Sequence, residues 1–131
     1  MLSDNNLLIR ALRSNAVFSG LSALLMLVTA EWLAAQLSLR SAVPVYVTAA
    51  LLILFALQLA NIVRTREIKR WEIKAIISGD LAWVVASIVL VALFHQSITA
   101  AGLMLIDIVA IAVLFFAIQQ IRGLRALGAA A

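Results

Sequence analysis

The chain has 131 residues, of which 66% are hydrophobic and 12% charged, and its formal net charge is +4. A soluble domain is about half apolar and about a quarter charged, and a chain this short cannot bury so many apolar side chains in a water-soluble fold. These numbers exclude an ordinary soluble domain and predict a protein that faces lipid. The sequence has no cysteine and a single histidine, so it offers no disulfide, thiolate metal site, iron–sulfur cluster or bis-histidine haem. We expect no metal and no cofactor.

Four long apolar segments predict four membrane-spanning helices, each close to the roughly 20 residues that a bilayer requires. After a short polar arm, we place the spans at about residues 15–37, 45–63, 75–94 and 98–119, in one domain covering residues 1–131. The first span has the form of a cleavable signal peptide that ends at Ala30, but its apolar character continues to Leu39, so we expect it to be retained. The predicted fold class is all-α: a four-helix transmembrane bundle of two hairpins.

Basic residues are concentrated on one predicted side of the membrane. Of the ten Lys and Arg residues, two lie in the N-terminal arm, five in a hinge over residues 64–74 and two in the C-terminal tail. Arg40 alone falls on the opposite side. The positive-inside rule therefore predicts that both termini and the hinge are cytoplasmic.

The basic hinge also predicts contact with lipid headgroups. Near an anionic membrane surface each basic side chain gains about 1 kcal/mol, and a tryptophan among them anchors the hinge at the interface. Because this explains the positive charge, we expect no nucleic-acid partner. The predicted headgroup contacts are Arg64, Arg66, Lys69, Arg70, Trp71 and Lys74.

Three acidic residues fall within the predicted spans, where ionisable groups are rare. Asp107 lies near the centre of the fourth span, Asp80 toward the cytoplasmic side of the third, and Glu31 toward the outer side of the first. Adjacent heights differ by roughly 5–10 Å at the helical rise, a gap that water or hydroxyl groups can bridge. Two interpretations stay open: three separate local contacts, or a ladder that conducts protons or cations.

Polar residues from three spans are expected to converge on the cytoplasmic side of the membrane. Asn15 of the first span, Gln58 and Asn61 at the end of the second, and Asp80 of the third lie at similar predicted depths. This inner cluster is either a structural hydrogen-bond cluster or a site. It is a better supported location for a site than the ladder.

The first span also carries a face suited to helix packing. Polar residues and Met26 recur there at steps of three and four, and Ala16 and Gly20 form a pair of small residues beside them. Such patterns are typical of close helix–helix seams in membranes. The alternative is the lining of a polar pathway.

Two short strings resemble patterns in small bacterial four-helix integral membrane proteins of unassigned function. They are NAVFSGL from Asn15 to Leu21 and DLAW from Asp80 to Trp83. The resemblance covers nearly the whole chain and implies a multi-pass protein of the bacterial inner (cytoplasmic) membrane, without implying an activity. The chain does not resemble the small multidrug exporters, whose essential glutamate lies deep in the first span, or the fluoride channels.

Four short helices leave little room for an enclosed substrate cavity, so we expect function to involve another chain or further copies of this one. The leading hypothesis is a non-catalytic subunit or a self-associating component of a membrane assembly, as a homo-oligomer or within a larger complex. The alternative is an oligomeric proton- or cation-linked transporter or channel that uses Asp80 and Asp107. No phosphate-binding loop, dinucleotide fingerprint, nucleophile elbow or zinc-protease motif is present, so we expect no enzyme.

Overall fold

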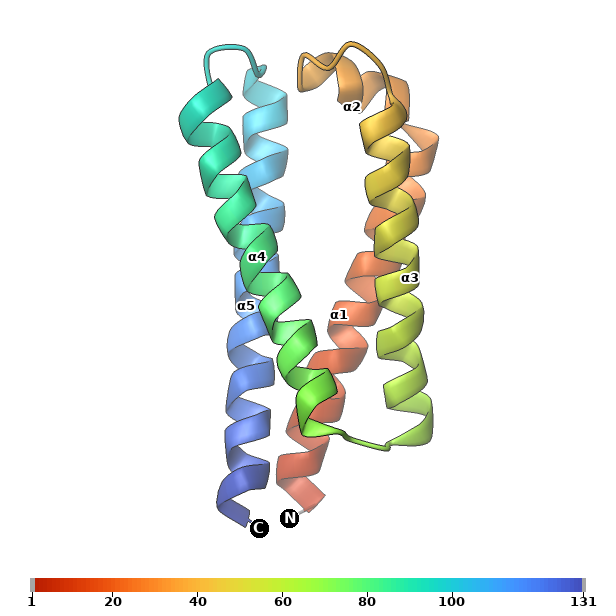
Figure 1. The fold of residues 1–131 in the computed structure, drawn as a ribbon, viewed down its shortest axis with the longest axis vertical. Coiled ribbons are helices and arrows are strands. Elements are labelled where there is room, and N and C mark those ends of the chain that lie inside the picture. The colour runs from red at the N-terminus through yellow and green to blue at the C-terminus, as the bar shows by residue number, and fades with distance from the viewer. Residues whose placement is uncertain (1, 131) are drawn as a thin grey trace.

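The computed structural model of the protein describes the backbone of residues 2–130 and the side chains of residues 6–128. Over these residues the helices are α1 (Leu2–Val28), α2 (Ala30–Gln36), α3 (Val43–Thr65), α4 (Arg70–Phe94) and α5 (Ala100–Ala130). All but α2 are long and apolar enough to cross a membrane, and they stand together as one bundle (Figure 1). The predicted all-α four-helix bundle is confirmed. Four such helices indicate a multi-pass membrane protein.

The long helices pair as two hairpins, as predicted. Helix α1 packs on α3, α4 packs on α5, and contacts between α1 and α5 join the hairpins. Among the described residues, no Cα atom of α3 lies within 8 Å of a Cα atom of α4, although these helices follow each other in the chain. The order around the bundle is therefore α3, α1, α5, α4, and α1 and α5 form the central contact.

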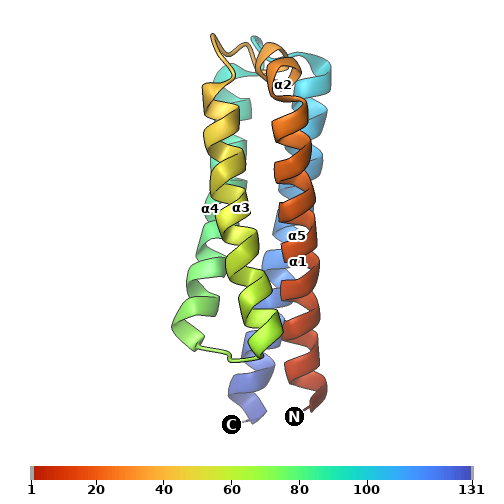
Figure 2. The same cartoon turned by 90° about the vertical axis from the view of Figure 1, so that its right-hand side faces the viewer.

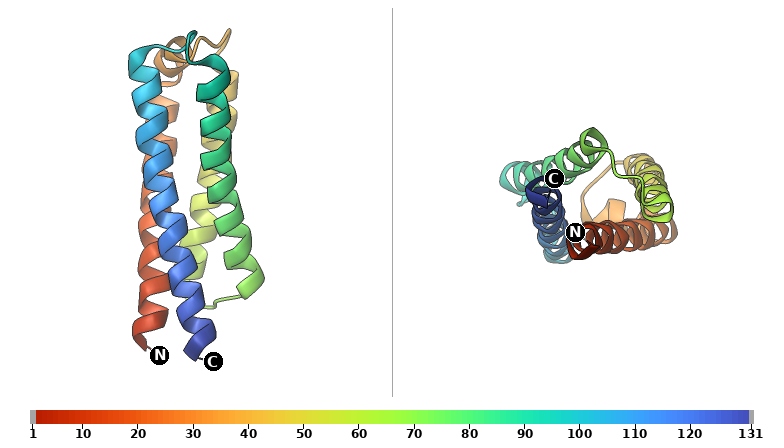
Figure 3. Two further views of the ribbon diagram at one scale, coloured as in Figure 1. Left: turned by 90° about the vertical axis from the view of Figure 1, so that its left-hand side faces the viewer. Right: turned by 90° about the horizontal axis from the view of Figure 1, so that it is seen from below.

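The chain divides the bundle into two distinct ends. Both termini and the α3–α4 loop lie at one end, which we call the hinge end (Figure 2). Helix α2 and the α4–α5 loop lie at the opposite end, which we call the turn end (Figure 3). All basic residues except Arg40 belong to helix segments or the loop at the hinge end.

The first predicted span is divided in the structure. Helix α1 already begins at Leu2 and ends at Val28, and α2 continues from Ala30 in a new direction across the turn end (Figure 1). The hydroxyl group of Thr29 donates a hydrogen bond of 2.6 Å to the carbonyl oxygen of Leu25. Such side-chain bonds to the preceding turn bend helices. The expected single helix over 15–37 is therefore two helices.

An apolar core fills the hinge end and explains why α1 extends into the predicted polar arm. All four long helices contribute to it, and Leu8 and Leu12 of the arm are fully buried. Burying a leucine contributes about 1.5–3 kcal/mol, so residues 2–14 are held as helix. The buried core residues are Leu8, Leu12, Leu59, Ile62, Ile73, Ile76, Ile77 and Leu124.

Hydrogen bonds tie the two hairpins together at the turn end. The backbone N–H of Thr99 donates to the carbonyl oxygen of Gln36 at 3.0 Å, and its hydroxyl donates to Oε1 of Gln36 at 2.6 Å. Ser38 donates to the carbonyl oxygen of Ser97 beside them. These bonds link α2 to the start of α5. The hairpins are therefore held at both ends of the bundle.

Candidate functional site

A group of polar side chains lies inside the bundle where α1, α4 and α5 meet. We call it the core polar cluster; it consists of Asn15 and Ser19 of α1, Asp80 of α4 and Gln120 of α5. Their exposed fractions are 1%, 5%, 4% and 0%, respectively. Buried polar groups of this kind need hydrogen-bond partners, because an unpaired group in an apolar medium costs several kcal/mol.

The cluster supplies these partners from within itself. Nδ2 of Asn15 donates to Oδ2 of Asp80 at 3.0 Å and to Oε1 of Gln120 at 2.9 Å. Nε2 of Gln120 donates to the same carboxylate oxygen at 2.8 Å. The hydroxyl group of Ser19 donates to Oδ1 of Asn15 at 3.1 Å. Asn15 thus uses both amide hydrogens and its carbonyl oxygen, and links all three helices.

Each helix presents its cluster residue on the stripe that also builds the apolar core. Asp80 follows Ile73, Ile76 and Ile77 at helical spacing, and all four are buried. On α5, Gln120 lies between Phe116 and Leu124 at steps of four. Residues at these spacings share one face of a helix. The inward turn of Asp80 and Gln120 is therefore imposed by the apolar residues around them.

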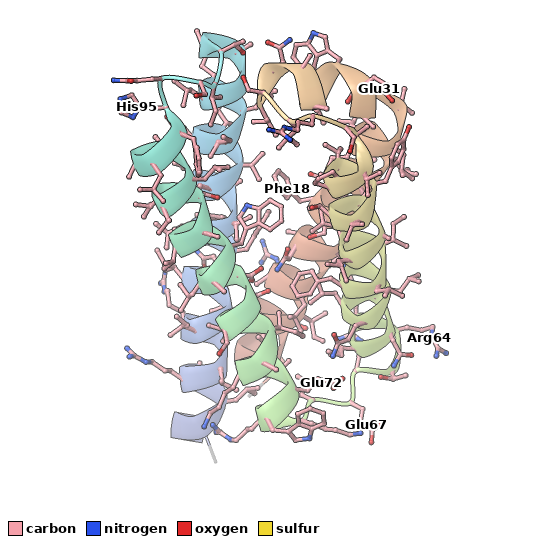
Figure 4. All side chains as sticks on the ribbon, turned by 45° about the horizontal axis from the view of Figure 1, so that its top comes forward. Phe18, Glu31, Arg64, Glu67, Glu72 and His95 are labelled. Atoms are coloured by element: carbon pink, nitrogen blue, oxygen red, sulfur yellow. The ribbon has the colours of Figure 1, made fainter. Side chains whose placement is uncertain are left out.

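Apolar side chains border the cluster along the bundle axis. Toward the hinge end lie the core residues Leu12, Ile76 and Leu124. Toward the turn end, the rings of Phe18 and Phe116 pack edge to face with centroids 5.4 Å apart. Figure 4 shows Phe18 between the two hairpins. Such surroundings strengthen the hydrogen bonds of the cluster, because their effective dielectric constant is low.

The sequence prediction of an inner cluster is right for two residues and needs correction for two others. Asn15 and Asp80 meet as expected, whereas Gln58 and Asn61 lie exposed on α3. Gln58 donates to Glu72 at 3.3 Å, and Asn61 accepts from Arg64 at 2.9 Å. The physical reason is the helix order: α3 packs its backbone closely on α1, whereas it reaches α4 only through side chains. Its polar residues near the hinge end therefore face outward.

Gln120 completes the cluster, and the sequence prediction missed it. It lies beyond the end assigned to the fourth span, next to a second glutamine. Its signal was available in the spacing: Val113, Phe116, Ala117 and Leu124 mark one buried face, and position 120 falls on that face. Extending the apolar period of the span by one turn would have singled it out.

Asp107 lies in a different environment from Asp80. It is exposed and lines an outer pocket of about 290 Å³ between α4 and α5. The other lining residues are Ser87, Ile88, Val91, Ala92 and Ala110. Neither Asp80 nor Glu31 lines this pocket. Glu31 is exposed on α2 at the turn end (Figure 4). The three predicted acids thus have three separate surroundings.

The six residues predicted to contact lipid headgroups are all exposed at the hinge end. Trp71 keeps 67% of its surface accessible, and Arg66 ends α3 in the left-handed conformation with φ 56°. Arg70 and Lys74 line a pocket with Arg125 of α5. These positions are compatible with headgroup contact.

The chemistry that the core polar cluster offers is proton or hydrogen-bond chemistry at one buried carboxylate. Within the part of the chain that the structure describes, no group of three or more His, Asp or Glu residues is placed to hold a metal ion. Comparisons with protein-family models, curated proteins and solved structures give no match.

Proposed function

We propose that the protein is a non-catalytic component of a membrane assembly that binds a transmembrane helix of a second chain through the outer face of α4 and α5. Asp107 carries this proposal, because its exposed carboxyl group lies on an otherwise apolar helix face between the exposed residues Met104 and Ile111. An aspartate facing lipid costs up to about 2.5–3.5 kcal/mol. A partner helix that supplies a hydrogen-bond donor removes this cost.

The pocket beside Asp107 supports helix binding in particular. Ala92 and Ala110 are small, which lets a partner backbone come close, and Ser87 adds a hydroxyl group. The hydroxyl of Ser87 donates to the carbonyl oxygen of Trp83 at 2.8 Å, which leaves its lone pairs available to a donor from the partner. Either a second copy of this chain or another membrane subunit can provide such a helix.

Association in the membrane tests the proposal. Asp107→Leu is expected to weaken the complex recovered in gentle detergent about tenfold, the effect of losing one interhelical polar contact. Glu31→Leu removes the same charge at the turn end and is the matched control, expected to leave association unchanged. Ala110→Trp fills the pocket and is expected to weaken association without changing charge.

Mass spectrometry of the recovered complex identifies whether the partner is a second copy or another chain. A wild-type protein that remains a monomer without bound protein, both in detergent and after crosslinking in membranes, would contradict the proposal. Unchanged association of Asp107→Leu and Ala110→Trp would contradict the assigned face.

A second candidate function is proton- or cation-linked transport by an oligomer, and Asp80 favours it. Both hydrogen bonds to its carboxylate, among the described residues, end on Oδ2, so Oδ1 is available to a proton or a cation. Liposomes that contain the protein and carry a pH gradient test this function. Transport requires proton flux in the wild type that Asp80→Asn abolishes; a wild type without flux rules it out.

We also propose that the protein resides in the bacterial inner membrane with both termini and the hinge in the cytoplasm. The charge distribution supports this orientation, since the hinge end carries every basic residue except Arg40.

A further inference from the structure

A groove on the outside of the bundle at the hinge end brings basic side chains from two helices together. It has a volume of about 430 Å³ and lies between the first turns of α4 and the last turns of α5. Arg70 and Lys74 of α4 and Arg125 of α5 supply three positive charges. Ser78 adds a hydroxyl group on the same wall. The groove is separate from the core polar cluster.

Among the described residues that line the groove, none carries a carboxylate. Glu72, the acidic residue closest to them on α4, faces α3, where it accepts a hydrogen bond from Gln58. No side-chain hydrogen bond between described residues involves Arg70, Lys74 or Arg125. The unpaired N–H groups of the first turn of α4 add to the positive potential, because Lys69, its N-cap residue, provides no side-chain cap. An anion between these groups would relieve their mutual repulsion.

A glycine allows Arg70 to reach across the groove. A Cβ atom at Gly128 of α5 would lie only 2.8 Å from Nη2 of Arg70. Any residue larger than glycine at position 128 would therefore displace the guanidinium group of Arg70. Arginine can hold a phosphate with two parallel N–H donors, so this position lets Arg70 face an anion bound between the helices.

The floor of the groove is apolar. Ile77, Ile121 and Leu124 form it, and Ile77 and Leu124 continue into the apolar core. An anion such as free phosphate would make no use of this surface, whereas an acyl chain would cover it. The exposed Trp71 in the same turn of α4 is a residue type enriched at membrane interfaces. The groove thus combines anion-binding groups with a surface for a hydrocarbon chain.

We infer that this groove binds one anionic phospholipid, with its phosphate among Arg70, Lys74 and Arg125 and an acyl chain along Ile77, Ile121 and Leu124. Charge selects the occupant. A phosphatidylglycerol headgroup brings net negative charge to three cations, whereas the choline group of phosphatidylcholine brings a positive charge that cancels the attraction.

Native mass spectrometry of the purified protein, titrated with phosphatidylglycerol or with phosphatidylcholine of the same acyl chains, tests this inference. The wild type is expected to bind one phosphatidylglycerol at least about tenfold more tightly than phosphatidylcholine. The triple variant Arg70→Gln, Lys74→Gln, Arg125→Gln is expected to lose this preference. Equal affinity of the wild type for both lipids would overturn the inference.

A charge-matched control separates the groove from general surface attraction. The triple variant Arg10→Gln, Arg13→Gln, Arg122→Gln loses the same net charge at exposed positions outside the groove and is expected to keep its affinity within about twofold. If both triple variants lose the same affinity, the attraction is diffuse and the groove is not a site. Circular dichroism and gel filtration report whether each variant is folded.

Two further arms keep the inference testable if the groove variant fails to fold. Gly128→Leu keeps every charge but displaces the guanidinium group, and it is expected to weaken phosphatidylglycerol binding severalfold. Millimolar inorganic phosphate is expected to leave the lipid bound. Displacement of the lipid by phosphate would identify a phosphate site in place of a lipid site. Unchanged phosphatidylglycerol binding in Gly128→Leu would show that Arg70 does not take part in the site.

Discussion

Each side chain of the core polar cluster bonds to another member of the cluster, and this mutual dependence determines what a substitution does. Asn15 contacts Asp80, Gln120 and Ser19. Removing one partner leaves a buried donor or acceptor of its neighbours without that bond, which costs more than the lost bond itself. Ser19 has a single bond in the cluster, to Asn15. The cluster therefore depends mainly on Asn15, Asp80 and Gln120.

Gln120→Leu is expected to lower the free energy of unfolding by about 1–2 kcal/mol, because Asp80 loses a donor and Asn15 loses an acceptor. Titration with a denaturing detergent in mixed micelles measures this change. Gln119→Leu is the matched control, since Gln119 takes part in no side-chain hydrogen bond between described residues. It is expected to be neutral or slightly stabilising. Equal losses in both variants would show that the cluster does not stabilise the bundle.

The sequence identified two cluster residues because an asparagine and an aspartate inside apolar spans are conspicuous by chemistry alone. Gln58 and Asn61 were predicted to join the same cluster because a sequence indicates how deep a residue lies in the membrane. It does not indicate which helices are neighbours in the bundle. Whether α3 or α5 lies beside α4 depends on side-chain packing across the whole bundle. Gln120 shows the converse. Its depth in the membrane was ambiguous because it lies just beyond the predicted fourth span, whereas the apolar residues Phe116 and Leu124 define the helix face on which it lies.

At the scale of whole helices, α1 and α5 make the contact on which the bundle depends, and they come very close at one glycine. A Cβ atom at Gly123 would lie 2.9 Å from both Cα and Cβ of Leu8. Because part of the obstacle is backbone, relief requires the two helices to move apart. The small pair Ala16 and Gly20, which the sequence suggested for a close seam, is more relaxed: a Cβ at Gly20 would lie 3.9 Å from Ala56.

Gly123→Ala is expected to destabilise the bundle by about 1–3 kcal/mol through this overpacking, although alanine favours helix over glycine by about 0.5–1 kcal/mol. Gly20→Ala is the control in which only the helix preference acts, so it is expected to be neutral or stabilising. Thermal unfolding followed by circular dichroism compares the two. A stabilised Gly123→Ala would mean that α1 and α5 are farther apart at this position than the structure places them.

Helix number and approximate positions were predictable because long apolar runs carry a strong signal. Helix ends were less so, for identifiable reasons. Residues 2–14 look polar in sequence, yet Leu8, Ile9, Ala11 and Leu12 among them are buried. The break at Thr29 leaves no trace in hydropathy, because apolar residues lie on both sides. The last turns of α5 lie beyond the predicted fourth span, in the C-terminal tail, yet Gly123 and Leu124 are buried there.

For the whole molecule, the decisive property is the separation of charge between the two ends. Single-cysteine labelling measures its consequence cleanly, since the natural chain has no cysteine. Glu67→Cys at the hinge end and Gln96→Cys at the turn end are both exposed positions. In intact spheroplasts a membrane-impermeant maleimide is expected to label only Gln96→Cys, and both variants after permeabilisation. Labelling of Glu67→Cys in intact cells would reverse the proposed orientation.

The wide backbone separation between α3 and α4 has a consequence for how the protein is made. Because α3 packs on α1 and α4 packs on α5, while α3 and α4 meet only through side chains near the hinge end, we expect each hairpin to form as a unit during biosynthesis. Two separately synthesised fragments, 1–66 and 67–131, are therefore expected to find each other in the membrane and to copurify. Until they meet, Asp80 lacks Asn15, and Asn15→Leu is expected to reduce the yield of the reunited pair. The hydrogen bond that the buried carboxylate of Asp80 accepts from Asn15 therefore stabilises the association of the two hairpins.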